Sequence, residues 1–192
     1  MSLNPDEKPD LRRHFRALRA AIPTAKRTAA AQALADRVLT ELTDPTTPTT
    51  PVFLYLATPH ELDTRPLIQR LLARQTPVLL PRIEADQLIP TPLTTLNQLE
   101  PGPHNTLQPP PATYNLQPTT YNLLIPALAV TPAGDRLGQG GGYYDRYLTQ
   151  HPNTQTTALV YDTQITDHLP TEPHDRRVQR IITPTRTIHC TT

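Results

Sequence analysis

Cysteine, serine and lysine are scarce in this chain of 192 residues, and each shortage excludes a kind of site. Cys190 is the single cysteine, which rules out an intramolecular disulfide and any cysteine-rich zinc site. Ser2 is the only serine, so serine hydrolase chemistry is excluded. The two lysines, Lys8 and Lys26, follow no glycine, and the chain therefore lacks the Walker A phosphate-binding motif.

Long apolar runs and a strong net charge are also missing. No apolar run approaches the length that spans a membrane, and the formal net charge of +1 gives no general attraction for nucleic acid. The first residues are charged and polar, unlike a secretory signal. We therefore expect a cytoplasmic protein, monomeric, that engages neither membrane nor nucleic acid.

Glycine is rare, yet five of the six glycines lie in the window 134–142. The window follows the apolar run 123–130 and precedes a predicted helix at 143–150, so the expected order is strand, glycine loop, helix. Glycine allows close backbone approach to a ligand, and exposed N–H groups at a helix N-terminus favour phosphate. A glycine-rich turn without a ligand is the alternative, but the charges of Arg136 and Asp145 beside it favour a ligand.

Apolar periodicity predicts helices and strands in alternation along residues 1–192, which we expect to form a single domain. Helices are expected at about 9–21, 24–43, 65–74 and 143–150, and strands at 52–56, 77–81, 121–125, 157–161 and 178–182. This alternation is typical of an α/β fold with a mainly parallel sheet. Ligands bind at the carboxyl ends of such strands, which would bring Glu61, Arg82 and the glycine loop to one edge.

The first helix carries an apolar stripe and several arginines. Its buried stripe is expected to consist of Leu11, Phe15, Leu18 and Ile22. The arginines lie on the remaining faces, and we expect Arg13 and Arg16 to be solvated; the set is Arg12, Arg13, Arg16 and Arg19. Lys8 and Arg12 are four residues apart, so they can reach one ligand together.

Proline is abundant, with 24 residues, and much of it gathers with threonine at about 43–51 and 90–120. Both segments are predicted to be non-helical connections. A pair of short strands with long loops is the alternative for 90–120, because a structureless loop of that length is unusual in a compact domain.

A long motif around the glycine window resembles a known family signature. The sequence Gly134-x-Arg136-Leu137-Gly138-x-Gly140-x-Gly142-Tyr143-Tyr144-Asp145 closely resembles that of the 5-formyltetrahydrofolate cyclo-ligase family, also called methenyltetrahydrofolate synthetases. Shorter matches follow in the family's order over nearly the whole chain: Lys8-x-x-Leu11-Arg12, Glu61-Leu62-Asp63-Thr64, Leu80-Pro81-Arg82, Leu124 to Ala129, His174-Asp175 and Ile182-Thr183.

The resemblance implies a fold and a reaction. It implies a three-layer αβα domain with a mainly parallel sheet, similar to the NagB/RpiA/CoA-transferase-like folds. It implies that the enzyme uses ATP and Mg²⁺ to convert 5-formyltetrahydrofolate to 5,10-methenyltetrahydrofolate, with release of ADP and phosphate. In the family's reaction ATP phosphorylates the formyl oxygen, N10 of the folate attacks the activated carbon, and phosphate leaves.

The resemblance also implies roles for individual residues. Catalytic roles fall to Arg136, Tyr143 and Asp145, and Asp145 is the expected Mg²⁺ ligand. The folate is expected to contact Leu56, Glu61, Tyr143 and Tyr144. ATP is expected to contact Lys8, Arg12, Gly134, Arg136, Leu137, Gly138, Gln139, Gly140, Gly141, Gly142 and Tyr143.

Taken without the resemblance, several of these residues have simpler interpretations. Asp145 can be an acid in a helix first turn, Glu61 an exposed loop acid and Leu56 a core residue. Only one of Tyr143 and Tyr144 is expected to face a ligand, and we favour Tyr143. Two alternatives remain for function: a protein of the same fold that acts on another acyl or formyl substrate, and a non-catalytic binding module.

Overall fold

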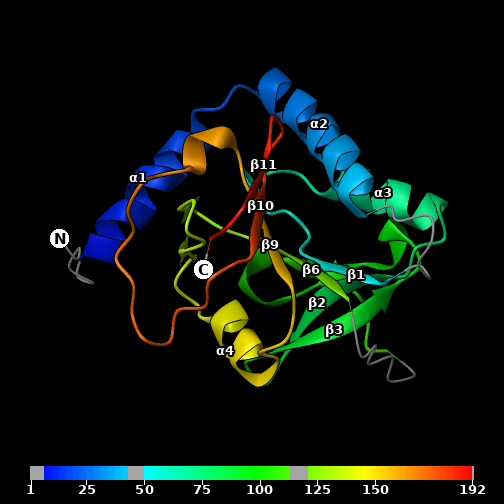
Figure 1. Cartoon of the computed structure of the whole chain (residues 1–192). Coiled ribbons are helices and arrows are strands. Elements are labelled where there is room, and N and C mark those ends of the chain that lie inside the picture. Colours follow the sequence, from blue (N-terminus) through cyan, green and yellow to red (C-terminus); the bar gives the residue numbers. More distant parts are fainter. Residues whose placement is uncertain (1–6, 43–49, 113–120, 192) are drawn as a thin grey trace.

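The computed structural model describes residues 7–42, 50–112 and 121–191 (Figure 1). These residues form an α/β fold around a seven-stranded sheet with the order β11-β10-β9-β6-β1-β2-β3. Most of the segment 43–51, and residues 113–120 of the second proline-rich segment, lie outside the described residues.

The sheet is parallel in its centre and antiparallel at its edges. The five strands β1, β2, β6, β9 and β10 are parallel to their neighbours, whereas β3 and β11 pair antiparallel with β2 and β10. The central strands are short and apolar, as is typical of strands buried on both faces. Their bounds are β1 (Val52–Leu54), β2 (Val78–Glu84), β3 (Gln87–Leu93), β6 (Asn122–Pro126), β9 (Thr156–Leu159), β10 (Arg180–Ile182) and β11 (Thr187–His189).

Helices cover both faces of the sheet, so the predicted three-layer αβα arrangement is confirmed. Alternate residues of a strand point to opposite faces. Leu54 packs in a cluster with α2 (Thr24–Leu42) and α3 (Arg65–Ala73), while the neighbouring Phe53 packs with α4 (Tyr143–Gln150) on the other face (Figure 1). None of the helices in the described ranges is long and apolar enough to cross a membrane.

Helix α1 (Lys8–Ala20) buries only part of the stripe that its periodicity predicts, with Leu11 and Ile22 partly buried against apolar clusters. Phe15 is buried, but Leu18 is exposed, and the buried polar residues of the helix are Lys8 and Arg19. The reason is the packing partner: Phe15 packs against the small hairpin of β7 (Ala129–Val130) and β8 (Arg136–Leu137). The prediction for Leu18 was therefore wrong, because α1 covers a polar site rather than the apolar sheet.

Part of the segment 90–120 forms strands, which agrees with the second of the two arrangements considered for it. Strand β3 carries Pro90 and Pro92 at the sheet edge, where a missing N–H donor is tolerated. Beyond it, β4 (Glu100–Pro101) and β5 (Leu107–Gln108) pair as a short hairpin, and the turn η3 (Pro103–Asn105) lies between them.

The apolar run before the glycine loop is also divided. It supplies β6 and then β7, and the chain turns at Gly134 before β8 and the loop 138–142. The glycine loop therefore leaves a hairpin rather than a long strand, and it leads directly into α4, whose N-cap is Gly142.

Candidate active site

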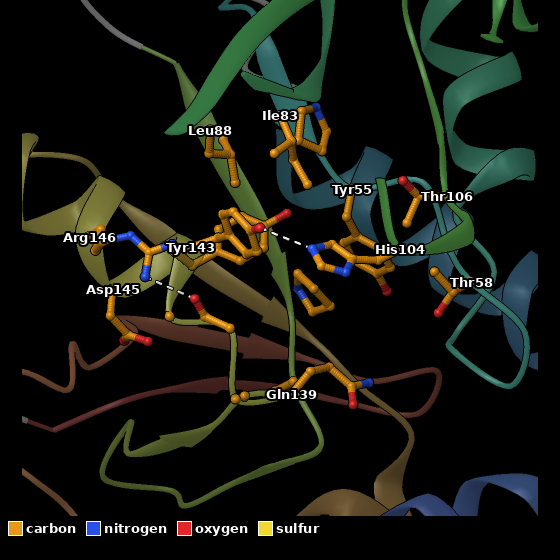
Figure 2. A pocket seen from close by; sticks show the side chains of 18 of the residues that line it. Tyr55, Thr58, Ile83, Leu88, His104, Thr106, Gln139, Tyr143, Asp145 and Arg146 are labelled. Carbon is orange, nitrogen blue, oxygen red and sulfur yellow. Dashed lines mark hydrogen bonds between the residues drawn. The ribbon is translucent and has the colours of Figure 1, made fainter. Parts of the chain in front are cut away.

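A cavity of about 1100 Å³ lies at the carboxyl ends of β1, β2 and β6, the edge at which parallel sheets bind ligands. Its walls are the loop after β1, the β4–β5 hairpin, the glycine loop with the start of α4, and the first turns of α1. Figure 2 shows part of this lining, with His104 and Tyr143 pointing toward one another across it.

The cavity collects nearly all the residues that the sequence predicts for the site. Lining it are Lys8, Arg12, Leu56, Glu61, Arg136, Leu137, Gly138, Gln139, Gly140, Gly141, Gly142, Tyr143, Tyr144 and Asp145. Gly134 is the exception. It lies in the β7–β8 turn at a φ of +90°, where an added Cβ would meet the carbonyl oxygen of Val178 at 2.3 Å. Its requirement for glycine is therefore explained by the turn.

Three arginines hold the glycine loop by its carbonyl oxygens. Arg12 donates from Nε to the oxygen of Gly138 at 3.1 Å, and Arg16 donates to the oxygen of Gln139 at 3.2 Å. Arg146 donates to the oxygen of Gly141 at 2.9 Å. Arg16 thus does more than form a solvated face, whereas Arg13 is exposed and pairs with Asp10, as expected for a surface arginine.

The arginines bind the loop's carbonyl oxygens, so its backbone N–H groups remain available. Within the described residues, none of the N–H groups from Gly138 to Gly142 donates a hydrogen bond. Free N–H groups beside three guanidinium groups, at the N-terminus of an eight-residue helix, favour an anion. Chemically, the loop is suited to phosphate.

Arg136 and Asp145 form an ion pair at the base of the loop. The distance from the Arg136 guanidinium to Oδ1 of Asp145 is 2.7 Å, and the two side chains are 4% and 18% exposed. The same Oδ1 accepts from the backbone N–H of Arg176, while Oδ2 accepts no hydrogen bond from the described residues. Nε of Arg136 is buried without a partner there. Oδ2 is thus free to meet a cation, and the guanidinium of Arg136 adds positive charge at the base of the loop.

Both tyrosines at the start of α4 line the cavity. The hydroxyl of Tyr143 contacts Nε2 of His104 at 3.0 Å, and the Arg146 guanidinium lies 4.9 Å from the centre of the same ring. Burial, and then the charge of Glu61, raise the pKa of Tyr144, although Arg136 opposes this. Tyr144 is therefore a neutral phenol at neutral pH and can donate a hydrogen bond within the cavity.

Lys8 enters the cavity already paired with two acids. Its Nζ lies 2.6 Å from Glu172 and 2.7 Å from Asp175. Burial acts to lower the pKa of Lys8, but the hydrogen bonds to Asp175 and Glu172 outweigh it and raise that pKa above 10.5. Burial acts to raise the pKa of Asp175, and the bonds from Lys8 and the Glu172 N–H overcome it, so that pKa lies below 3.8.

The same acids belong to a group that can hold a metal ion. One ligand atom from each of Glu172, His174 and Asp175 lies within 4.8 Å of the others. In this structure the cation among them is the ammonium group of Lys8. Nε2 of His174 lies 3.8 Å from Oδ1 of Asp175, and both residues belong to the cavity wall.

Glu61 lies at the other end of the cavity and is buried rather than solvated. Its Oε2 accepts from the N–H of Thr58 at 2.9 Å, and its Oε1 lies 3.7 Å from the guanidinium of Arg19. A buried carboxylate facing a cavity is suited to bind N–H donors of a ligand.

Comparison with known proteins gives the arrangement a context. The model of the 5-formyltetrahydrofolate cyclo-ligase family matches residues 4–184. The chain belongs to this family. An Escherichia coli protein named 5-formyltetrahydrofolate cyclo-ligase is 30% identical over 167 residues, which are 81% of this chain and 88% of that one. The Mycolicibacterium smegmatis protein of the same name is 46% identical over 67 residues, or 34% of each chain.

A solved structure agrees in fold. The Aquifex aeolicus 5,10-methenyltetrahydrofolate synthetase superimposes with a TM-score of 0.76 at 23% identity, covering 95% of this chain and 92% of that one. The predicted family, the α/β fold and the assignment of the chain as an enzyme of the cyclo-ligase family are thereby confirmed.

The sequence analysis did not single out Arg19, which pairs with Glu61, or His104, which lines the cavity, and its expectation for Arg82 differs from the structure. Arg19 and His104 carried no signal, since an arginine on a helix and a histidine in a proline-rich segment are ordinary features. Arg82 does not line the cavity; it donates to Glu100 and to the carbonyl oxygen of Pro109, both at 2.7 Å, and so anchors the β4–β5 hairpin.

Proposed function

We propose that this cyclo-ligase family member converts 5-formyltetrahydrofolate to 5,10-methenyltetrahydrofolate, with ATP and Mg²⁺, releasing ADP and phosphate. The observation that carries the proposal is the joint lining of one cavity by the glycine loop and Glu61. At about 1100 Å³ the cavity exceeds the usual upper range for a single small ligand, which suits a nucleotide and a folate together.

The loop end of the cavity is the proposed nucleotide site. The free N–H groups of 138–142 bind the ATP phosphates, and Arg12 fixes the loop at Gly138 while presenting positive charge. Phosphoryl transfer depends on alignment and on neutralising charge rather than on a covalent group of the protein. Arg136 lines the cavity and supplies a permanently charged, planar group, which suits the phosphoryl group in transfer.

The carboxylate of Asp145 is the proposed Mg²⁺ ligand. Its Oδ2 is free of hydrogen bonds within the described residues, and Mg²⁺ takes one or two carboxylates along with phosphate oxygens and water. Bound there, the ion would neutralise charge on the phosphates. Arg136 holds the other oxygen of Asp145 and so fixes the direction of the free one.

The Glu61 end is the proposed pterin site. Oε1 of Glu61 accepts N–H donors of the ring, and Leu56 provides apolar contact in the same wall. Tyr143 and Tyr144 line the same cavity, where a phenol can hydrogen-bond the formyl group. The formyl oxygen takes the γ-phosphoryl group from ATP, N10 attacks the formyl carbon, and the oxygen leaves as phosphate.

An optical assay tests the proposal. Purified protein is mixed with 5-formyltetrahydrofolate and Mg²⁺, and the near-ultraviolet absorbance of the methenyl product is followed with and without ATP. The expected result is a rise that needs ATP and is lost in Asp145→Asn. Absence of a rise in a folded protein that binds ATP would refute this substrate assignment.

A further inference from the structure

Arg19 of α1 lies behind Glu61 and outside the cavity. Its side chain is 5% exposed, and that of Glu61 is 7% exposed. Glu61 lines the cavity, whereas Arg19 does not. Burial lowers the pKa of Arg19, and the charge of Glu61 is the largest influence that opposes this. Glu61 is thus the principal charge partner of Arg19.

The geometry of this pair is poorly suited to a purely stabilising role. The closest N–O distance is 3.7 Å, longer than a hydrogen bond, and Nε of Arg19 is buried without a partner among the described residues. A buried ion pair overcomes its desolvation cost only when good hydrogen bonds accompany it. A buried donor left unpaired requires another explanation, and function is one of them.

The backbone around Glu61 is held by other groups. The hydroxyl of Tyr161 donates to the carbonyl oxygen of Glu61 at 3.3 Å, and that of Tyr55 donates to the carbonyl oxygen of Leu62 at 3.0 Å. Glu61 Oε2 is bound to the N–H of Thr58. The loop therefore has its own anchors, and the charge of Arg19 acts chiefly on the carboxylate.

We infer that Arg19 is a positioning residue that compensates the charge of Glu61 while leaving Oε1 free to accept the N–H donors of the pterin. This role rests on the proposed function. Within the described part of the chain Oε1 accepts no hydrogen bond, so the nearby guanidinium supplies charge without occupying the lone pairs. A hydrogen-bonded arginine at the same place would compete with the ligand for that oxygen.

The first test uses Arg19→Met, Arg19→Lys and the control Arg13→Met, whose arginine lies on the same helix but is 76% exposed. Arg19→Met is expected to raise the KM for 5-formyltetrahydrofolate about tenfold to a hundredfold, the range for a hydrogen bond to a charged group. The kcat and the KM for ATP should stay within about threefold, because the glycine loop is untouched. Arg19→Lys should recover part of the loss, and Arg13→Met should match the wild type.

A double-mutant cycle separates this role from general packing. In a Glu61→Gln background, Arg19→Met is expected to change the folate KM by less than about threefold, because there is no longer a charge to compensate. The double variant loses both buried charges together, so it folds even where Arg19→Met alone does not. Equal effects of Arg19→Met in both backgrounds would overturn the inference.

Turnover by the wild-type protein separates the role of Arg19 from the proposed function. Wild-type turnover with an unchanged folate KM in folded Arg19→Met would overturn the role of Arg19 and leave the proposed function standing. A wild type that forms no methenyl product would overturn the proposed function, and the role of Arg19 with it.

Discussion

Replacement of Arg136 by methionine tests the loop end of the cavity most directly. The substitution keeps most of the side-chain length but removes the charge and the hydrogen bond to Asp145. Breaking a fully buried pair by removing one partner costs about 3–5 kcal/mol. Asp145 is partly exposed and keeps its bond from the Arg176 N–H, so we expect a smaller loss of stability of about 2–3 kcal/mol.

Both stability and rate should respond, and by different amounts. For a chain of this size the loss corresponds to a fall in Tm of about 5–10 °C. Removal of one donor to developing charge slows an enzyme about 10²- to 10³-fold. We therefore expect kcat to fall at least about a hundredfold at a temperature where the variant remains folded.

The assay combines thermal unfolding with the absorbance of the methenyl product. The matched control is Arg180→Met, which also removes an arginine from a partly buried ion pair, with Glu41, on β10 outside the cavity. Arg180→Met should lower Tm but leave kcat within about twofold. A kcat within about threefold of wild type in folded Arg136→Met would refute the assignment, and so would an equal loss in the control.

Three further predictions concern other parts of the site. Gly134→Ala should lower the unfolding free energy by at least about 2 kcal/mol, because the added Cβ meets a backbone oxygen at 2.3 Å; an unchanged Tm would contradict this. His104→Ala should raise the folate KM about three- to tenfold, because it removes the contact with the Tyr143 hydroxyl. Steady-state kinetics measure this, and an unchanged KM would show that the contact does not contribute to folate binding. The difference in unfolding free energy between wild type and Lys8→Met should not change with pH near neutrality. There Asp175, whose pKa is lowered, and Lys8, whose pKa is raised, are both charged. The difference should shrink below pH 3.8, as Asp175 takes up a proton, and above pH 10.5, as Lys8 loses one; unfolding curves across that range check it.

Local patterns predict the elements of this fold well. Helix α4 has the bounds expected from the sequence, α2 and α3 end one residue earlier than expected, and α1 begins and ends one residue earlier. The rarity of glycine elsewhere made the loop conspicuous, and the structure places it in the cavity wall. These features depend on nearby residues, which is why the sequence predicts them.

The features that the sequence did not predict depend on distant partners. Arg19 is buried because it packs against Glu61 of the loop after β1. Helical periodicity could not show this, since it assigns any arginine to a polar face. Leu18 is exposed because α1 covers the site rather than the sheet. The position of the β4–β5 hairpin depends on contacts of Arg82 and Gln108 across the chain, and no local pattern specifies those contacts.

The edge strand β3 has a consequence for self-association. An open sheet edge offers a row of N–H and C=O groups on which a second copy of a chain can add a strand. Pro90 and Pro92 interrupt that row, since neither carries an N–H group. An incoming strand would find two acceptors without donors at this edge, and growth of the sheet into a fibril would stop there. The prolines that mark this chain as unusual in composition thus act here as a guard against aggregation.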